Sequence, residues 1–179
     1  SAEDIPVVAF SVGEEELSGI DTAPLVGHMA AWNYFMSEET PENEAFIQAW
    51  HNYIGDTKRV TNDPMEAHYI GFNMWVKAVE AAGTTDTDKV IDAMVGVEVP
   101  NLTGGTSTML PNHHITKPVL IGEIQADGQF EVVSETEDLV PGDAWSDFLP
   151  ESKPLKSDWV ELKCGNYNTE TEKCLGSSS

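Results

Sequence analysis

Basic residues are scarce in this sequence. Lysine and arginine together number 9, against 31 aspartate and glutamate residues, which gives a formal net charge of -22. A surface with this balance repels nucleic acid and anionic lipid. The composition therefore excludes binding to those polyanions and favours an acidic soluble protein.

Long apolar runs and catalytic motifs are also missing. No run of apolar residues is long enough to span a bilayer, and no signal peptide is recognisable. The sequence has no G-x-S-x-G, H-E-x-x-H, Walker A or EF-hand pattern. We therefore expect no enzyme activity and no cofactor; a hydrolase acting on amides would need a nucleophile–base motif that the sequence does not offer.

Cysteine occurs only twice, at Cys164 and Cys174, which bracket the polar segment CGNYNTETEKC. Two cysteines this close in an otherwise cysteine-free chain indicate a small disulfide loop and an oxidising compartment. Two free thiols on a tail are the alternative. A zinc site is disfavoured because no second pair of cysteine or histidine residues lies nearby.

The best-marked element is a helix within residues 60–83. Asn62 or Asp63 can cap it, Pro64 suits its first position, and Gly83 ends it. Its apolar stripe is formed by Met65, Tyr69, Phe72, Val76 and Val79, widened by Met74 and Trp75.

The start of this helix is the best-placed receptor for an anion or a dipole in the sequence. Glu66 lies three residues after Asp63, in the first turn, where the helix dipole favours a carboxylate. His68 lies one turn into the helix and is a candidate ligand contact. An ordinary capping role for Asp63 and a surface role for His68 remain open.

A second candidate site follows the first apolar run, IPVVAF at residues 5–10, which reads as a strand of a parallel sheet buried on both faces. In open α/β sheets, ligands gather beyond the carboxyl ends of strands. Ser11 lies at that end, although it also suits the cap of a short helix over residues 14–17. The run Glu14-Glu15-Glu16 is typical of a solvated helix start.

The remaining pattern predicts alternating elements and then an irregular tail. Residues 27–35 read as extended, 41–53 and 87–95 as helices, and 106–110, 119–125 and 129–134 as strands, the last two joined by a hairpin turn at Ala126-Asp127-Gly128. The segment PNHHITKP reads as an exposed loop, in which His113 and His114 have ordinary polar roles rather than metal ligation. Beyond Glu135, we expect Trp145, Phe148 and Trp159 to anchor an irregular tail.

Several segments together resemble one family. These are IPVVAFSVGEEEL, TPENEAFIQAWHNY, TNDPMEAHYIGFNMWVKAVEAAGTTDTDKVIDAM and LPNHHITKPVLIGEIQADGQF, and the terminal CGNYNTETEKC fits the same branch. The chain resembles the urea-binding proteins of bacterial ABC transporters, which belong to the urea and short-chain amide branch of the type I periplasmic binding proteins.

The resemblance implies an α/β fold with two lobes joined by three crossovers, of which this chain is the C-terminal part. It implies that residues 1–35 complete the sheet of the second lobe and that residues 36–108 supply helices to the first lobe. Residues 109–135 would return to the second lobe as a hairpin. Residues 136–179 would form an irregular tail with the disulfide loop.

The resemblance also implies a function. It places Phe10, Ser11 and Val12 at a strand end facing the ligand, with Asp63 at a crossover near the cleft. The expected protein captures urea or a short amide outside the cytoplasm, in the periplasm, and delivers it to a membrane permease. The missing N-terminal half or another copy would cover exposed apolar surface. The alternative is an amide-responsive regulatory sensor on the same fold, which would be cytoplasmic and would not need a disulfide.

Overall fold

A computed structural model describes residues 1–143, 149–158 and 161–175. The chain forms two compact units, Ser1–Gly142 and Asp143–Ser179. The predicted anchors Trp145, Phe148 and Trp159 lie outside the described residues. Within the described part of the chain, no helix has the length and apolarity that a membrane crossing requires.

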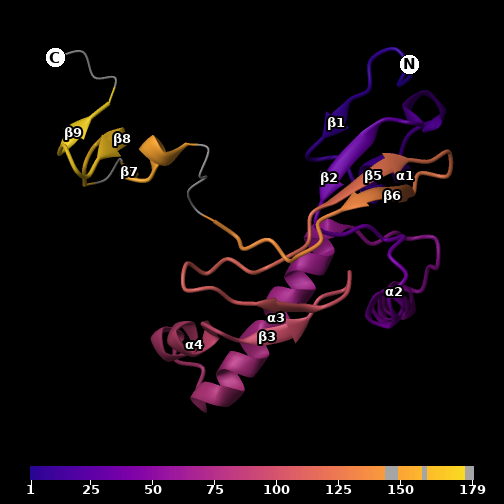
Figure 1. Cartoon of the computed structure of the whole chain (residues 1–179). Coiled ribbons are helices and arrows are strands. Elements are labelled where there is room, and N and C mark those ends of the chain that lie inside the picture. Colours follow the sequence, from indigo (N-terminus) through magenta and orange to yellow (C-terminus); the bar gives the residue numbers. More distant parts are fainter. Residues whose placement is uncertain (144–148, 159–160, 176–179) are drawn as a thin grey trace. The chain divides into compact units, whose positions relative to one another are not determined.

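The first unit contains a four-stranded sheet in the order β1-β2-β5-β6 (Figure 1). Its strands are β1 Val8–Ala9, β2 Met29–Trp32, β5 Leu120–Ile124 and β6 Phe130–Glu135. β1 runs parallel to β2, and the other neighbours are antiparallel. The short helix α1, Glu14–Ser18, and the 3-10 turn η1, Ala23–Leu25, lie between β1 and β2 in the sequence.

The prediction that residues 5–10 form a strand buried on both faces is wrong. Only Val8 and Ala9 are in a strand, and Ile5, Val7 and Val8 are exposed. β1 is an edge strand because, among the described residues, only β2 pairs with it. A parallel strand needs covering on both faces before its apolar run is buried.

The predicted hairpin is confirmed. β5 and β6 pair around a turn in which Gly128 has a φ of 80°. A side chain at Gly122 would come within 2.7 Å of the Phe35 ring, so the close packing of Phe35 on β5 requires glycine there. Phe35 belongs to a core with Leu17, Ala30, Leu120, Ile124 and Phe130, and the centroids of the Phe35 and Phe130 rings lie 4.5 Å apart.

Three longer helices lie between β2 and β5 in the sequence. They are α2 Pro41–Ile54, α3 Asp63–Ala82 and α4 Thr87–Met94, close to the predicted bounds. Thr40 caps α2 and Asp86 caps α4 through their side chains. Gly55 and Gly83 end α2 and α3 in the left-handed conformation, as helix termini commonly do. The ribbon β3 Glu98–Pro100 and β4 Thr106–Thr108 follows α4, and β3 packs against α3.

The apolar stripe predicted for α3 is only partly correct. The buried face consists of Glu66, Ile70, Met74 and Ala78, and Ile70 and Met74 pack against Val99 and Met109. Phe72 is 62% exposed and Trp75 is 40% exposed. The helical spacing of the apolar residues is as predicted. However, α3 carries apolar residues on both its buried and its exposed face, and the sequence alone does not indicate which of the two faces is buried within the first unit.

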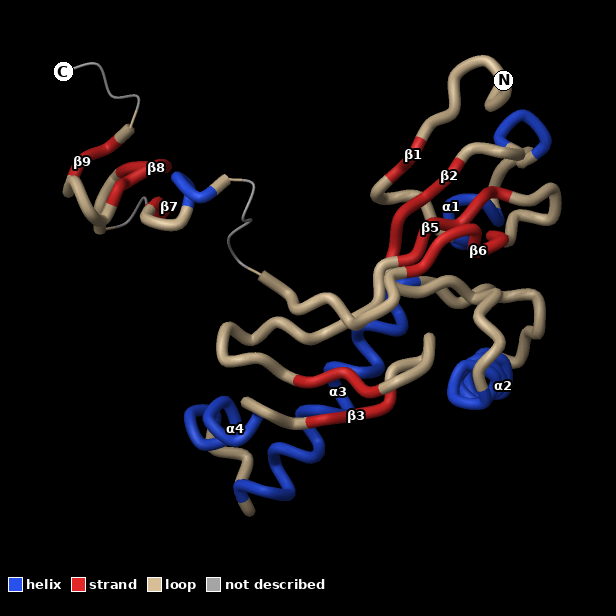
Figure 2. Tube along the Cα trace, viewed as in Figure 1, coloured by secondary structure: helices blue, strands red, loops and turns tan. Residues whose placement is uncertain are grey.

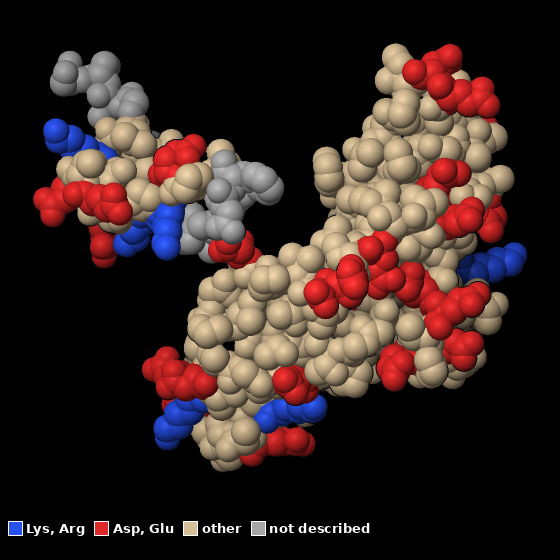
Figure 3. Space-filling view, in the orientation of Figure 1, with Lys and Arg blue, Asp and Glu red and all other residues tan. Residues whose placement is uncertain are grey.

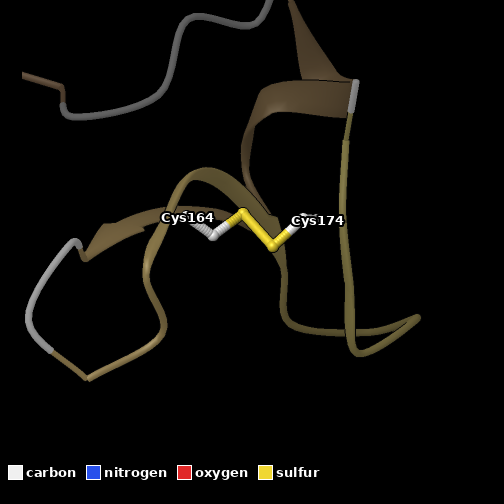
Figure 4. Close-up of a disulfide and its surroundings, with 2 residues drawn as sticks. All are labelled: Cys164 and Cys174. Carbon is white, nitrogen blue, oxygen red and sulfur yellow. A yellow bond between two sulfur atoms is a disulfide. The ribbon is translucent and has the colours of Figure 1, made fainter. Parts of the chain in front are cut away.

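The second unit corrects the prediction of an irregular tail. Its described residues form the 3-10 turn η2, Pro150–Ser152, and a three-stranded antiparallel sheet of β7 Leu155–Asp158, β8 Cys164–Asn168 and β9 Lys173–Cys174. The predicted disulfide joins Cys164 to Cys174, with Cα atoms 5.9 Å apart, and is confirmed (Figure 4). It links the first residue of β8 to the last residue of β9.

Candidate functional site

The first unit has a sheet half and a helical half, and the chain passes between them more than once. Segment 33–40 leads from β2 to α2, and segment 109–119 leads from β4 back to β5 (Figure 2). Val140, beyond β6, forms an antiparallel bridge with Lys117 in the second of these segments. The candidate site lies where these crossover segments meet the start of α3.

Asp63 occupies the first position of α3 and ties the helix to a crossover segment. The side chain of Asn62, rather than Asp63, caps the helix by accepting a hydrogen bond from the Met65 N–H. The Asp63 Oδ2 atom accepts from the Asn33 backbone N–H at 2.9 Å. Burial raises the pKa of Asp63, while the Asn33 N–H and the Lys117 charge act in the opposite direction.

Glu66 and Lys117 form a buried ion pair on the next turn of α3. Their side chains are 0% and 9% exposed, respectively. Burial raises the pKa of Glu66, and the neighbouring Asp63 carboxylate raises it further, whereas Lys117 lowers it. The ion pair joins the helical half to segment 109–119. Lys117 lies in the part of it, residues 111–118, that the sequence predicts to be an exposed loop, but its side chain is buried.

A hollow of about 500 Å³, which we call the crossover pocket, opens beside these residues. Its wall includes Asn33, Asp63, Glu66 and Lys117 as the polar groups of the junction. The rest of the lining comes from α3, from segment 109–119 and from the residues after Leu139: Ala67, Gly71, Met109, His113, His114, Ile115, Val119, Val140, Pro141 and Gly142.

The two histidines of the crossover pocket are held by local backbone geometry. His113 has a φ of 63°, and its N–H donates to the Leu110 carbonyl at 2.8 Å. A side chain at Gly142 would come within 2.3 Å of His114, so residue 142 lies directly against this loop. No group of three or more potential metal ligands comes together in the portion of the chain that the structure describes.

Three of the predicted ligand residues follow β1 in the sequence, and none of them lines the crossover pocket. Phe10 is 76% exposed and Ser11 is exposed. Val12 is half-buried, and its carbonyl accepts a hydrogen bond from the Trp32 indole N–H at 2.8 Å. The predicted cap role of Ser11 is wrong, because Gly13 is the cap residue of α1.

His68 is not brought together with Asp63. It is exposed, and its Nδ1 atom lies 2.7 Å from the Pro64 carbonyl oxygen one turn earlier in α3. It lines a separate hollow with Phe46 and Met65. Of the predicted site residues, only Asp63 lies in the crossover pocket.

Glu14 corrects the prediction of a solvated helix start. It is 1% exposed, and its Oε1 atom accepts a hydrogen bond from the Met36 backbone N–H at 2.6 Å. Its Oε2 atom is buried without a hydrogen-bond partner. Burial raises the pKa of Glu14 to about 7, with smaller contributions in the same direction from Asp63 and Glu16. Beside it, Glu15 is exposed and pairs with Arg59 at 3.2 Å.

Asn33, Lys117 and the burial of Glu14 are not predicted from the sequence. One signal was available for Lys117, which is one of only 9 basic residues in an acidic chain and follows two histidines. The spacing of Asp63 and Glu66 also places both carboxylates on one side of a helix, where a single lysine can face both. Among the charged residues on the visible face of the first unit, aspartate and glutamate predominate over lysine and arginine (Figure 3).

Comparison with known proteins gives a family match over most of the chain. Residues 1–151 match the periplasmic binding protein domain family. A solute-binding protein of an ABC transporter from Rhodopseudomonas palustris HaA2, in complex with p-hydroxybenzoic acid, has a TM-score of 0.65 at 25% identity. The match covers 75% of this chain and 38% of that one. An amino acid ABC transporter substrate-binding protein from Pseudomonas fluorescens Pf-5 has a TM-score of 0.65 at 22% identity, covering 81% and 39% of the two chains.

Curated relatives match shorter segments. A protein from Geobacillus stearothermophilus named limonene hydroxylase is 31% identical over 115 residues, 64% of this chain and 21% of its own length. The Leu/Ile/Val-binding protein homolog 6 of Brucella abortus is 27% identical over 100 residues, 55% of this chain and 25% of its own length. The chain thus spans well under half the length of these proteins. The family match and the two solved structures described above concern solute-binding proteins, whereas the name of the Geobacillus protein describes an enzyme.

The fold and the family match agree. The matched family covers residues 1–151, and the α/β arrangement of the first unit has the fold of a solved solute-binding protein at a TM-score of 0.65. The chain belongs to the periplasmic binding proteins, with the type I fold of ABC-transporter solute-binding components.

Proposed function

We propose that the protein captures urea or a short-chain amide in the periplasm and delivers it to the membrane permease of an ABC transporter, without catalysis. The observation that carries the proposal is the charge balance of the crossover pocket. Asp63 and Glu66 face a single lysine, Lys117, so the junction is rich in acceptors and carries a net negative charge when both carboxyl groups are ionised.

The chemistry of urea fits such a site. Urea is small, neutral and planar, with four N–H donors and one strong acceptor. A closed site must satisfy each of these groups, because a buried unpaired polar group costs about 1–3 kcal/mol. The Asp63 carboxylate would accept from ligand N–H groups, and the Asn33 side chain could meet the remaining polar groups.

An anionic ligand fits less well. The p-hydroxybenzoic acid bound by the Rhodopseudomonas protein carries a carboxyl group, and an amino acid carries one too. In this pocket, the Lys117 ammonium is already paired with Glu66, and Asp63 adds a further negative charge nearby. Like charges at short range disfavour a carboxylate ligand, which supports a neutral amide instead.

The residues at the end of β1 would complete the site from the sheet half. We propose that the exposed Phe10 ring covers the plane of the ligand and excludes water, and that Ser11 and the backbone of Val12 offer further hydrogen-bonding groups. His68 lines the separate hollow with Phe46 and Met65, and would contact the ligand only if the bound ligand extended from the crossover pocket to that hollow.

The assignment of segments to lobes is part of the same proposal. Residues 1–35 and 109–135 would belong to the second lobe and residues 36–108 to the first, with the tail following from residue 136. The remainder of the protein or another copy would cover exposed apolar side chains such as Phe72 and Trp75. The Cys164–Cys174 disulfide supports an oxidising compartment and therefore transport rather than cytoplasmic sensing.

Calorimetric titration of the full-length protein tests this function. We expect heat of binding with urea, formamide or acetamide, and none with benzoate or leucine at the same concentrations. The variant Asp63→Asn is the matched probe, because it keeps an acceptor but removes the charge. Tighter binding of benzoate or leucine than of every amide would contradict the proposal.

A further inference from the structure

The crossover pocket contains a buried lysine whose ammonium group is already paired with a carboxylate. Lys117 and Glu66 both line the pocket, and their side chains are almost completely removed from solvent. Among the lining residues, Lys117 is the one lysine, and no arginine accompanies it. An ammonium group in such a place would attract a ligand carboxylate if nothing neutralised it.

We propose that Glu66 sets the charge selectivity of the pocket. By pairing with the Lys117 ammonium group, Glu66 makes the pocket reject carboxylate ligands. The inference rests on the proposed function, because it assumes that the crossover pocket receives the ligand. It goes further by assigning the rejection of anions to one residue, and by stating that loss of the Glu66 charge converts the pocket into one that accepts a carboxylate.

The backbone around both residues is fixed independently of their side chains. Glu66 lies on α3, and its N–H donates to the Asn62 carbonyl at 3.1 Å. The Lys117 N–H donates to the Val140 carbonyl at 3.0 Å, and the Val140 N–H donates back to the Lys117 carbonyl at 2.8 Å. Removing the Glu66 charge would therefore release the ammonium group while leaving the Lys117 backbone in place.

Asp63 does not replace Glu66 in this role. Its Oδ2 atom accepts from the Asn33 N–H, and it stands at the start of the helix, where the dipole also stabilises its charge. A ligand carboxylate must still approach with Asp63 nearby, so the gain in anion affinity is limited. It remains measurable, because the pocket passes from a net negative charge to neutrality.

The test is the affinity of the full-length Glu66→Gln variant for benzoate, measured by calorimetry beside the wild type. We expect the variant to bind benzoate measurably at concentrations where the wild type shows no heat, which corresponds to a gain in affinity of at least about tenfold. The control Glu80→Gln removes the same charge from an exposed position on the same helix and should produce no gain. The double variant Glu66→Gln/Lys117→Met has neither charge and should also produce none.

The outcomes separate this inference from the proposed function, which depends on amide binding by the wild type. A folded Glu66→Gln variant with no gain in benzoate affinity would overturn the inference and leave amide capture intact. An equal gain in the double variant, or tight benzoate binding by the wild type, would overturn it as well. If Glu66→Gln does not fold, Glu66→Met carries the same test, because methionine suits a helix and demands no buried hydrogen bond.

Discussion

The Asp63 carboxylate accepts a hydrogen bond from the backbone N–H of Asn33, 30 residues earlier in the chain, at 2.9 Å. Asn33 in turn donates from its side-chain amide to the Pro118 carbonyl at 2.6 Å. One carboxylate at the start of α3 thus connects the helical half to segment 33–40, and through Asn33 to segment 109–119. Asp63 serves as a tie between crossover segments, while its neighbour Asn62 serves as the helix cap.

The variants Asp63→Ala and Asn62→Ala should therefore behave differently. Asp63→Ala leaves a partly buried N–H unpaired, which costs about 1–3 kcal/mol, and should also weaken amide binding by at least tenfold. Asn62→Ala loses the cap, at a cost of about 0.5–2 kcal/mol, and should leave affinity unchanged. Thermal unfolding and calorimetry of the full-length variants measure both quantities. Unchanged affinity in Asp63→Ala would remove Asp63 from the binding site.

Glu14 predicts a pH dependence of stability. Its pKa in the folded protein, about 7, lies above the ordinary value of 4.5, so the folded state binds more protons between these two values. Stability therefore falls as the pH rises from about 4.5 to 7, by about 3 kcal/mol in total for this group. Asp63 and Glu66, whose pKa values are also raised, add to the slope in the same direction.

The variant Glu14→Gln isolates this contribution. Glutamine keeps an acceptor for the Met36 N–H but cannot ionise, so the variant should show a flatter profile and greater stability than the wild type at pH 8. Urea is a proposed ligand, so guanidinium unfolding at several pH values is the better measurement. The exposed control Glu42→Gln should keep the wild-type slope. A wild-type slope in Glu14→Gln would show that the buried carboxyl group is not its source.

The disulfide should stabilise only the second unit. A bridge that closes a loop of this size contributes about 2–4 kcal/mol. We expect the Cys164→Ser/Cys174→Ser variant to become sensitive to proteases beyond residue 143, with an unchanged unfolding transition for residues 1–142, which contain their own hydrophobic cores. Reduction of the wild type should reproduce the effect. Mass spectrometry that finds both thiols free in freshly purified protein would contradict the bridge itself.

The exposed apolar face of α3 predicts self-association of this chain in isolation. The rings of Phe72 and Trp75 stack at a centroid distance of 5.8 Å, and both are exposed, as is Tyr69 on the preceding turn. Contiguous exposed apolar surface commonly marks an interface. Light scattering should detect oligomers of the chain, and the variant Phe72→Ser/Trp75→Ser should reduce them. A monomeric unmodified chain at high concentration would contradict this expectation.

The features that were predictable from the sequence depend on short-range signals. The bounds of α2, α3 and α4 follow from capping residues, prolines and terminal glycines, and the β5–β6 hairpin follows from Asp127-Gly128. The disulfide follows from two isolated cysteines. Each helix end, turn and cysteine pair is marked by residues close to it in the sequence, so a single sequence is enough to find it.

The features that were missed depend on contacts between distant segments. Glu66 and Lys117 are 51 residues apart, and Glu14 and Met36 are 22 apart. No local pattern distinguishes a buried lysine or glutamate from a solvated one, because burial is decided by what packs over the side chain. The exposure of β1 and of Phe72 has the same cause. An apolar pattern predicts that a surface is buried, but it does not show which segment packs against that surface.

The most direct test of the account is a crystal structure of the full-length protein with urea or acetamide bound. We predict that ligand N–H groups lie within hydrogen-bond distance of the Asp63 carboxylate, and that the Phe10 ring, from outside the crossover pocket, covers the plane of the ligand. A bound amide that contacts neither Asp63 nor any residue at the end of β1 would contradict the placement of the site in this chain.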